Sequence, residues 1–201
     1  MPLTLCARAL YKQRVWAVWV WGLLCLAAGQ RHWAEQAFLA VLQRAPEHTG
    51  AMASLAHLMA QDGRLEPALL WQKGVAELQP NHASAWFNLG YLLERSQQPQ
   101  QAEPAFRKAL GINPRLDQAW YALGLVLFQQ SKHTEALLAF QENTRLQPFN
   151  SHGWTMQAQL HHRLNMQVEL DRTLSHLRGF DPKAAMALER SLLGGCVGAT
   201  H

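Results

Sequence analysis

The sequence predicts an all-α protein built from five copies of a 34-residue helix hairpin followed by a short capping helix. The first observation is a proline that recurs every 34 residues, as Pro46, Pro80, Pro114, Pro148 and Pro182. Proline interrupts a helix interior, so each of these residues marks the same boundary between helices. The interval leaves room for two helices of about a dozen residues each and two tight turns.

The second observation is a helical spacing of apolar and small residues inside each interval. In the third interval, the positions i, i+3, i+4 and i+7 of the first helix are Trp86, Leu89, Gly90 and Leu93. The second helix carries a similar face, made of Ala102, Phe106, Ala109 and Leu110. One hairpin cannot bury such faces alone, so we expect neighbouring hairpins to stack into a solenoid.

These residues resemble the tetratricopeptide repeat, whose signature is Trp-x2-Leu-Gly-x2-Tyr, then Ala-x3-Phe, then Pro. The fourth repeat carries it as Trp120, Leu123, Gly124, Leu127, Ala136, Phe140 and Pro148. The resemblance covers residues 15–184 and is most specific in the two central repeats, where leucine replaces the tyrosine. It implies a right-handed superhelical solenoid whose inner groove binds a segment of another protein.

The period divides the chain into five repeats and three flanking segments. A basic segment covers 1–14, the repeats cover 15–48, 49–82, 83–116, 117–150 and 151–184, a capping helix covers 185–193, and a flexible tail covers 194–201. The outer repeats are less regular; in the second repeat, Met52 and Gln72 replace the tryptophan and the phenylalanine. Pro104 falls inside the second helix of the third repeat, so that helix either starts late or is kinked.

The apolar run at 15–28 follows Arg8, Lys12 and Arg14 and has three interpretations. The favoured one is the first helix of the first repeat, because Gly22 and Phe38 then occupy the family positions. The other two are a membrane anchor and a cleaved signal peptide. Fourteen helical residues span about 21 Å, less than the ~30 Å core of a bilayer.

The charge distribution and the cysteine content indicate which binding partners and which cellular compartment to expect. The formal net charge of +4 is concentrated before residue 15, whereas a nucleic-acid surface needs a basic stripe along the folded body. Nucleic acid is therefore not a predicted partner. Cys6, Cys25 and Cys196 form no metal-binding or redox motif, which suits a reducing compartment. We expect a cytoplasmic protein, with membrane anchoring through 15–28 as the alternative.

No catalytic motif stands out in the sequence. There is no GxGxxG, P-loop, HExxH or GxSxG pattern. The ten histidines are scattered, and the adjacent pair His161 and His162 would point about 100° apart on a helix. We therefore predict no catalytic residue, no cofactor and no metal site, and a protein that is not an enzyme.

The candidate partner-binding surface lies opposite the core face of each first helix. An ordinary amphipathic helix would be polar there, but these positions hold aromatic and apolar residues. Such faces usually mark interaction sites, and rigid rings are good anchors. The alternative is that the rings pack against the next repeat. The predicted groove residues are Trp19, Leu23, His57, Phe87, Asn88, Tyr91, Arg95, Tyr121, Leu125 and Phe128.

The resemblance also indicates which ligand to expect. Family members that clamp a carboxyl terminus use a lysine at the fifth position of a repeat, where this chain has Ala53, Phe87 and Tyr121. An apolar or aromatic peptide segment is expected instead. The predicted function is a non-catalytic scaffold, adaptor or chaperone that binds such a segment. The alternative is an assembly platform that uses residues 1–28 either to attach to a membrane or to self-associate, in the second case as a homo-oligomer.

Overall fold

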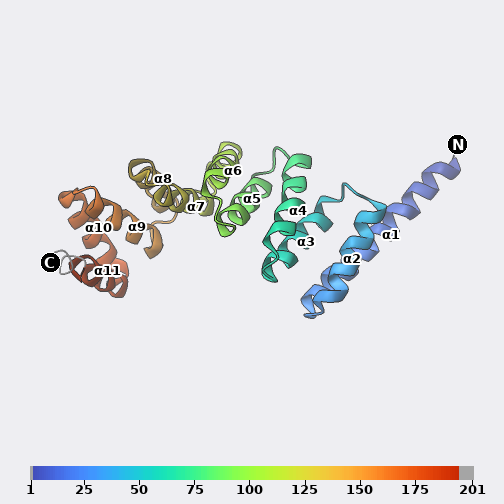
Figure 1. Ribbon diagram of the computed structural model, residues 1–201, viewed down its shortest axis with the longest axis horizontal. Helices are drawn as coiled ribbons and strands as arrows, with labels where there is room; N and C mark the ends of the chain where they lie inside the picture. The colour runs from blue at the N-terminus through green and yellow to red at the C-terminus, as the bar shows by residue number, and fades with distance from the viewer. Residues whose placement is uncertain (1, 195–201) are drawn as a thin grey trace. The chain divides into compact units, whose positions relative to one another are not determined.

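The protein is described by a computed structural model that covers the backbone of residues 2–194 and the side chains of residues 14–192 (Figure 1). The described residues form eleven helices and no strand. Their bounds are α1 Pro2–Ala27, α2 Arg31–Arg44, α3 Thr49–Gln61, α4 Leu65–Leu78, α5 Ala83–Arg95, α6 Pro99–Ile112, α7 Asp117–Gln129, α8 His133–Leu146, α9 Ser151–Arg163, α10 Gln167–Phe180 and α11 Pro182–Gly194.

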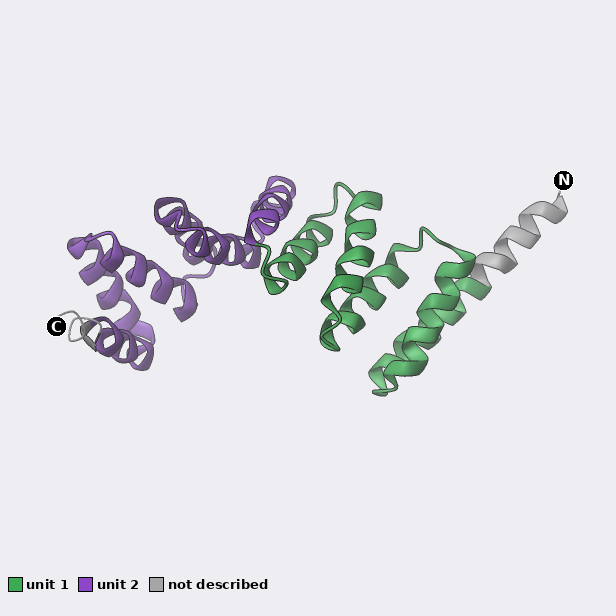
Figure 2. Ribbon diagram, in the orientation of Figure 1, with its two compact units in different colours: residues 1–98 green, residues 99–201 purple. Residues whose placement is uncertain are grey.

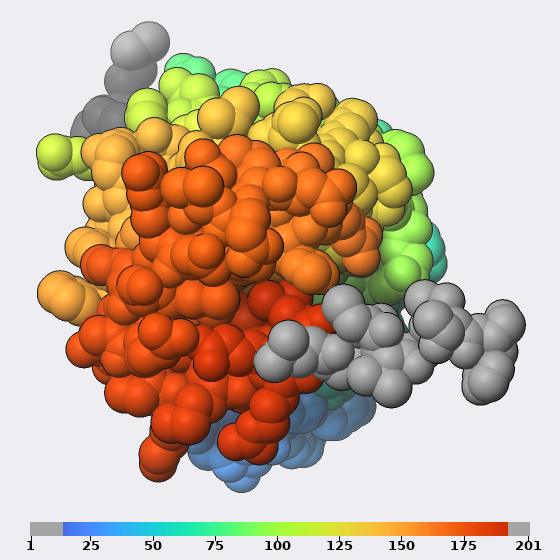
Figure 3. Space-filling view, turned by 90° about the vertical axis from the view of Figure 1, so that its left-hand side faces the viewer, coloured from blue at the N-terminus to red at the C-terminus, as the bar shows by residue number. Residues whose placement is uncertain are grey.

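The helices belong to two compact units, residues 1–98 and residues 99–201 (Figure 2). In unit 1, α1 pairs with α2 and α3 pairs with α4, while α2 also packs on α3 and α4 on α5. In unit 2, each helix from α6 to α10 packs on the next, and α11 contacts both α9 and α10. Figure 3 shows the face of unit 2 where α10 and α11 lie together. Each unit is therefore a stack of consecutively packed helices.

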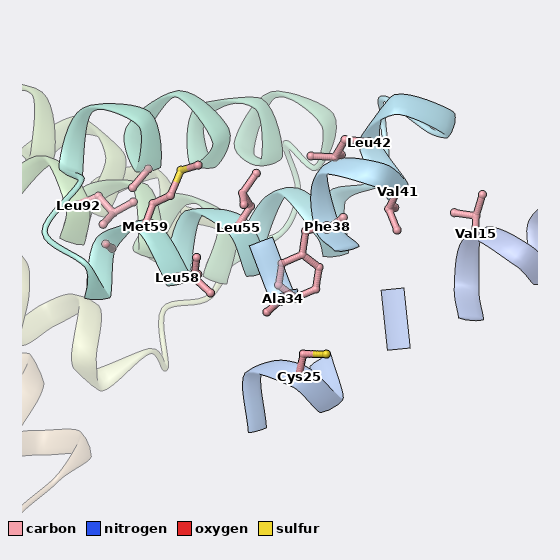
Figure 4. Close-up of a cluster of buried hydrophobic side chains, with 13 residues drawn as sticks. Val15, Cys25, Ala34, Phe38, Val41, Leu42, Leu55, Leu58, Met59 and Leu92 are labelled. Atoms are coloured by element: carbon pink, nitrogen blue, oxygen red, sulfur yellow. The ribbon is translucent and has the colours of Figure 1, made fainter. Parts of the chain in front are cut away.

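A single hydrophobic cluster joins the two hairpins of unit 1. Phe38 from α2 and Leu55 and Leu58 from α3 are fully buried in it (Figure 4). Val15 and Cys25 contribute from α1. The apolar run at 15–28 thus packs as the first helix of the first hairpin. None of the helices in the described part of the chain is both long and apolar enough to cross a membrane.

Glycine at the eighth position of a repeat makes room for phenylalanine at the twenty-fourth. A Cβ built on Gly22 would lie 2.6 Å from Phe38 Cε1, and one on Gly124 would lie 2.7 Å from Phe140 Cε1. The two positions change together along the sequence, as Gly22/Phe38, Ala56/Gln72, Gly90/Phe106, Gly124/Phe140 and Ala158/Leu174. Only the repeats with phenylalanine at the twenty-fourth position have glycine at the eighth, because the two helices could not pack so closely around the ring otherwise.

The repeat tryptophans link each first helix to the loop before it. The indole Nε1 of Trp86 donates a hydrogen bond to the carbonyl oxygen of Pro80 at 2.9 Å. Trp120 donates to Pro114 at 2.9 Å, and Trp154 donates to Pro148 at 2.8 Å. The three indoles are only half-buried. The tryptophan and proline of the signature are therefore partners in one contact between successive repeats.

Every hairpin turns through a residue of left-handed backbone at the fifteenth position of its repeat. These residues and their φ angles are Gly29 at 74°, Gly63 at 77°, Gln97 at 58°, Ser131 at 61° and Asn165 at 57°. A left-handed residue just after a helix lets the last carbonyls of that helix find partners. Glycine takes this conformation without strain, and the other three side chains accept it at a small cost.

The helix bounds add detail to three sequence expectations. α1 spans Pro2–Ala27, so residues 2–14 of the predicted basic segment are helical and continuous with the first helix of the first repeat. α6 begins at Pro99 and contains Pro104, so a late start of that helix is excluded. α11 spans Pro182–Gly194, and its Ala185 and Leu188 are buried. Most of the predicted tail at 194–201, with Cys196, lies outside the described residues.

Candidate functional site

Unit 1 contains a cleft of about 420 Å³ between the first helices of the second and third repeats. One wall is α3, the other is α5, and Gln72 of α4 lies between them. The lining residues recur three or four positions apart on each helix, so each wall is a single helix face. They are Ala53, Ala56, His57, Ala60 and Gln61 on α3, and Phe87, Asn88, Tyr91, Leu92 and Arg95 on α5.

The cleft exists because the second repeat lacks bulk at two places. The α3 wall carries the small residues Ala53, Ala56 and Ala60. In addition, Gln72 occupies the repeat position that holds a buried ring in unit 1's other complete hairpin, Phe38. Gln72 is only 3% exposed, and its Nε2 donates to the carbonyl oxygen of Ala85 at 2.9 Å. A satisfied amide thus replaces a phenylalanine ring at the base of the cleft.

Tyr91 and Arg95 form one end of the α5 wall. The Tyr91 side chain is 48% exposed, although its position faces the cleft. The Arg95 guanidinium lies 5.9 Å from the centroid of the Tyr91 ring. Arg95 Nη1 also donates to the carbonyl oxygen of Ala60 at 3.3 Å, in the last turn of α3. A cation at this helix end is electrostatically favourable and holds the two walls together.

The remaining polar groups of the cleft are neutral amides and a histidine. Asn88 is exposed and, within the described residues, its amide makes no hydrogen bond. On the opposite wall, His57 Nε2 and Gln61 Nε2 lie 2.9 Å apart. The lining holds one arginine and no acidic residue. The cleft therefore presents an exposed ring, the unpaired amide of Asn88 and a positive charge.

A smaller cavity of about 220 Å³ extends the cleft along α3. The two share Ala53, Gln72 and Asn88 as lining residues. Two predicted groove residues, Trp19 and Leu23, do not line either cavity but pack against the core of unit 1. Trp19 covers Gly50, where a Cβ would lie 3.1 Å from its ring. Its indole nitrogen is buried and has no hydrogen-bond partner among the described residues.

The predicted groove residues of unit 2 are half-buried on α7. The Tyr121 ring meets the Phe140 ring edge-on, with centroids 5.6 Å apart, and burial raises the pKa of its hydroxyl. Phe128 lies 5.5 Å from the His133 ring and 4.9 Å from the Arg163 guanidinium. Leu125 is also half-buried. Tyr121 therefore has an internal partner that the sequence argument did not give it.

Half of the predicted groove residues meet in the cleft: His57, Phe87, Asn88, Tyr91 and Arg95. A continuous stripe from Tyr91 of unit 1 to Tyr121 of unit 2 remains a prediction. The small residues of the α3 wall and Gln72 line the cleft but were not among the predicted groove residues. The signal that could have revealed them is the absence of the repeat phenylalanine at Gln72, which marks a place where the stack is less full.

No group of three His, Cys, Asp or Glu side chains in the part of the chain that the structure describes is placed to hold a metal ion. The two adjacent histidines have different surroundings. His161 is buried, with Nδ1 3.1 Å from the Thr173 hydroxyl, whereas His162 is exposed. Burial lowers the pKa of His161, and the nearby Glu169 carboxylate opposes that shift.

Comparison with known proteins identifies the repeats. The tetratricopeptide repeat model matches residues 73–117 and 87–151. No protein of curated function matches the sequence. A structure of MamA aligns with a TM-score of 0.79 and 20% identity, over 86% of this chain and 94% of that one.

Two further structures share the fold at low identity. YrrB, described as a tetratricopeptide-repeat protein with an unusual peptide-binding site, aligns with a TM-score of 0.76 and 15% identity, over 86% of this chain and 90% of that one. PilF of Pseudomonas aeruginosa aligns with a TM-score of 0.74 and 18% identity, over 93% and 86%. The repeated glycine–phenylalanine and tryptophan–proline contacts, the all-helical stack and these matches agree: residues 73–151 carry tetratricopeptide repeats, and the described helices have the fold of a solved tetratricopeptide-repeat protein.

Proposed function

We propose that this protein is a non-catalytic adaptor or chaperone that holds an apolar or aromatic peptide segment of a partner protein in the cleft between α3 and α5. The tetratricopeptide-repeat fold supports a protein–protein interaction scaffold. The observation that carries the finer proposal is Tyr91, a ring left 48% exposed beside a cleft with an alanine wall.

The chemistry of the lining supports a peptide as the ligand. An apolar side chain that entered against Ala53, Ala56 and Ala60 would lose contact with water and gain contact with the Tyr91 ring. The Asn88 amide can both donate to and accept from a peptide backbone. Arg95 supplies the only full charge of the lining, so a segment with an acidic residue near its apolar anchor fits best. YrrB, which shares the fold, is described as having a peptide-binding site.

Photocrosslinking from inside the cleft tests the proposal. Benzoylphenylalanine is placed at Asn88, which faces the cleft, and in a control protein at Lys73, which is exposed on α4 outside the lining. The probe is a random peptide display library. We expect crosslinking from position 88 but not from position 73, with selected peptides rich in aromatic and apolar residues. Equal crosslinking from both positions, or selection of purely polar peptides, would contradict the proposal.

A further inference from the structure

The outer face of α1 is apolar, although it is exposed. Between residues 14 and 28, Val15, Gly22 and Cys25 are buried on the side of the helix that packs into unit 1. The exposed positions fall on the opposite side, as 100° per residue requires. They are Arg14, Trp16, Ala17, Trp21, Leu24, Ala27 and Ala28. Arg14 is the one polar residue among them.

The large members of this face are more than half exposed. Trp16 is 57% exposed, Trp21 59% and Leu24 58%. By contrast, the exposed residues of α6 include Gln100, Gln101, Arg107 and Lys108. On α8 the exposed Leu138 stands among the exposed polar residues Glu135 and Gln141. A contiguous apolar face on a helix surface usually marks an interaction site. We define the α1 face as Trp16, Trp21 and Leu24. We therefore expect this face to bind a partner.

The charge of the surrounding sequence has one sign. The first 34 residues contain Arg8, Lys12, Arg14 and Arg31 and no acidic residue. Because the whole chain has 18 basic and 14 acidic residues, the remaining residues carry no net charge. The net positive charge of the chain thus lies in its first 34 residues, which include the α1 face, although Arg31 among them pairs with Asp62. A partner of this face should be anionic as well as apolar.

We propose that the α1 face is a peripheral docking surface for an anionic lipid bilayer. Tryptophan rings favour the level of the lipid headgroups, and Leu24 can reach the acyl boundary between them. Arg31 is paired with Asp62, but Arg8, Lys12 and Arg14 belong to a stretch of sequence without acidic residues, and such basic residues are attracted to anionic headgroups. A second copy of the chain fits less well as the partner. Its own first helix would bring further basic residues and no acidic residues to balance them. The docking surface is separate from the peptide cleft and does not depend on it.

Vesicle flotation of the full chain tests this docking. The probes are vesicles of phosphatidylcholine alone and vesicles containing phosphatidylglycerol. We expect the protein to float with the anionic vesicles and to be released by salt, as screening predicts. Replacing both rings, Trp16→Gln with Trp21→Gln, should lower the bound fraction at least about tenfold without adding charge. Trp21→Tyr alone keeps an interfacial ring and should retain binding.

Phe149→Gln is the matched control, because Phe149 is 79% exposed but lies in unit 2. It should bind vesicles as the wild type does, and thermal melts should show every variant folded. Three results would overturn the proposal: wild-type protein that stays unbound, equal binding to neutral and anionic vesicles, or unchanged binding by the variant that lacks both rings. A dimer that this variant abolishes, without vesicle binding, would assign the face to a second copy instead.

Discussion

At Gly124, the first helix of the fourth repeat lies against the Phe140 ring with no room for a side chain. A Cβ there would approach three ring carbons at 2.7 to 2.9 Å. Gly111 of α6 is the opposite case, since a Cβ built on it meets nothing within 4 Å. Substituting Gly124 therefore measures the effect of a steric clash on stability. Substituting Gly111 measures only the effect of replacing glycine in a helix.

We predict that Gly124→Leu lowers the free energy of unfolding by about 1–3 kcal/mol, because it overpacks the hairpin against Phe140. Gly111→Ala should leave stability unchanged or raise it by up to about 1 kcal/mol, as helix propensity alone dictates. Urea denaturation monitored by circular dichroism measures both. Equal stability of Gly124→Leu and the wild type would contradict the close contact between Gly124 and the Phe140 ring.

The residues of the cleft show what a repeat pattern can and cannot predict. Helical periodicity placed His57 on the groove side of α3 and Phe87 and Tyr91 on the groove side of α5, and in the structure all three line the cleft. Periodicity could not predict that Trp19 would lie over Gly50 and pack into unit 1. The position of the Trp19 ring depends on the small size of Gly50 on the neighbouring helix. A pattern read from single positions does not contain such pairwise information.

At the scale of elements, ion pairs join successive hairpins at equivalent positions. Arg64 forms a bidentate pair with Glu35 at 2.8 and 2.9 Å, and Lys132 contacts Glu103 at 2.8 Å. Each pair joins the turn of one repeat to the second helix of the repeat before it. The hydrogen bond from Arg64 is the main cause that lowers the pKa of Glu35. Because the Arg64 and Lys132 side chains are exposed to solvent, which screens the attraction, each pair orients the hairpins more than it stabilises them.

The α9–α10 hairpin contains a buried histidine whose protonation should lower the stability of the fold. His161 is 4% exposed and faces the Thr173 hydroxyl across the hairpin. Burial disfavours the charged ring, so its pKa in the folded protein lies below the ordinary value of 6.5, despite the opposing effect of Glu169. The unfolded chain then binds the proton more readily, so stability is fully present above pH 6.5 and is lost as the pH falls through the lowered value.

We predict that lowering the pH from about 7.5 to about 5.5 reduces the melting temperature of the wild type more than that of His161→Gln. His162→Gln is the matched control, because His162 is the next residue but is exposed. It should keep the pH response of the wild type. Thermal melts of the three proteins at both pH values provide the measurement. A pH response that disappears with His162 rather than His161 would contradict the assignment.

At the scale of the whole molecule, the 34-residue period was enough to predict an all-helical stack, because prolines, glycines and rings recur in fixed register. The period could not predict that the cleft would form between the second and third repeats. The cleft arises where the pattern fails, at Gln72 and the alanines of α3. In the same way, the apolar residues of α1 form one buried face and one exposed face. Composition alone cannot tell which residues lie on which face.

The central claim is that the cleft of unit 1 binds a peptide through Tyr91, and one paired measurement tests it most directly. The dissociation constant of a peptide selected from the display library is measured by fluorescence anisotropy for the wild type, Tyr91→Ala and the control Leu138→Ala, whose side chain is 62% exposed on α8. The melting temperature of each protein is measured alongside. We predict that Tyr91→Ala weakens binding about thirtyfold, or ~2 kcal/mol, while its melting temperature and the control's affinity stay near wild-type values. Unchanged affinity, or a loss of ~3–5 kcal/mol in stability typical of a core ring, would contradict the account.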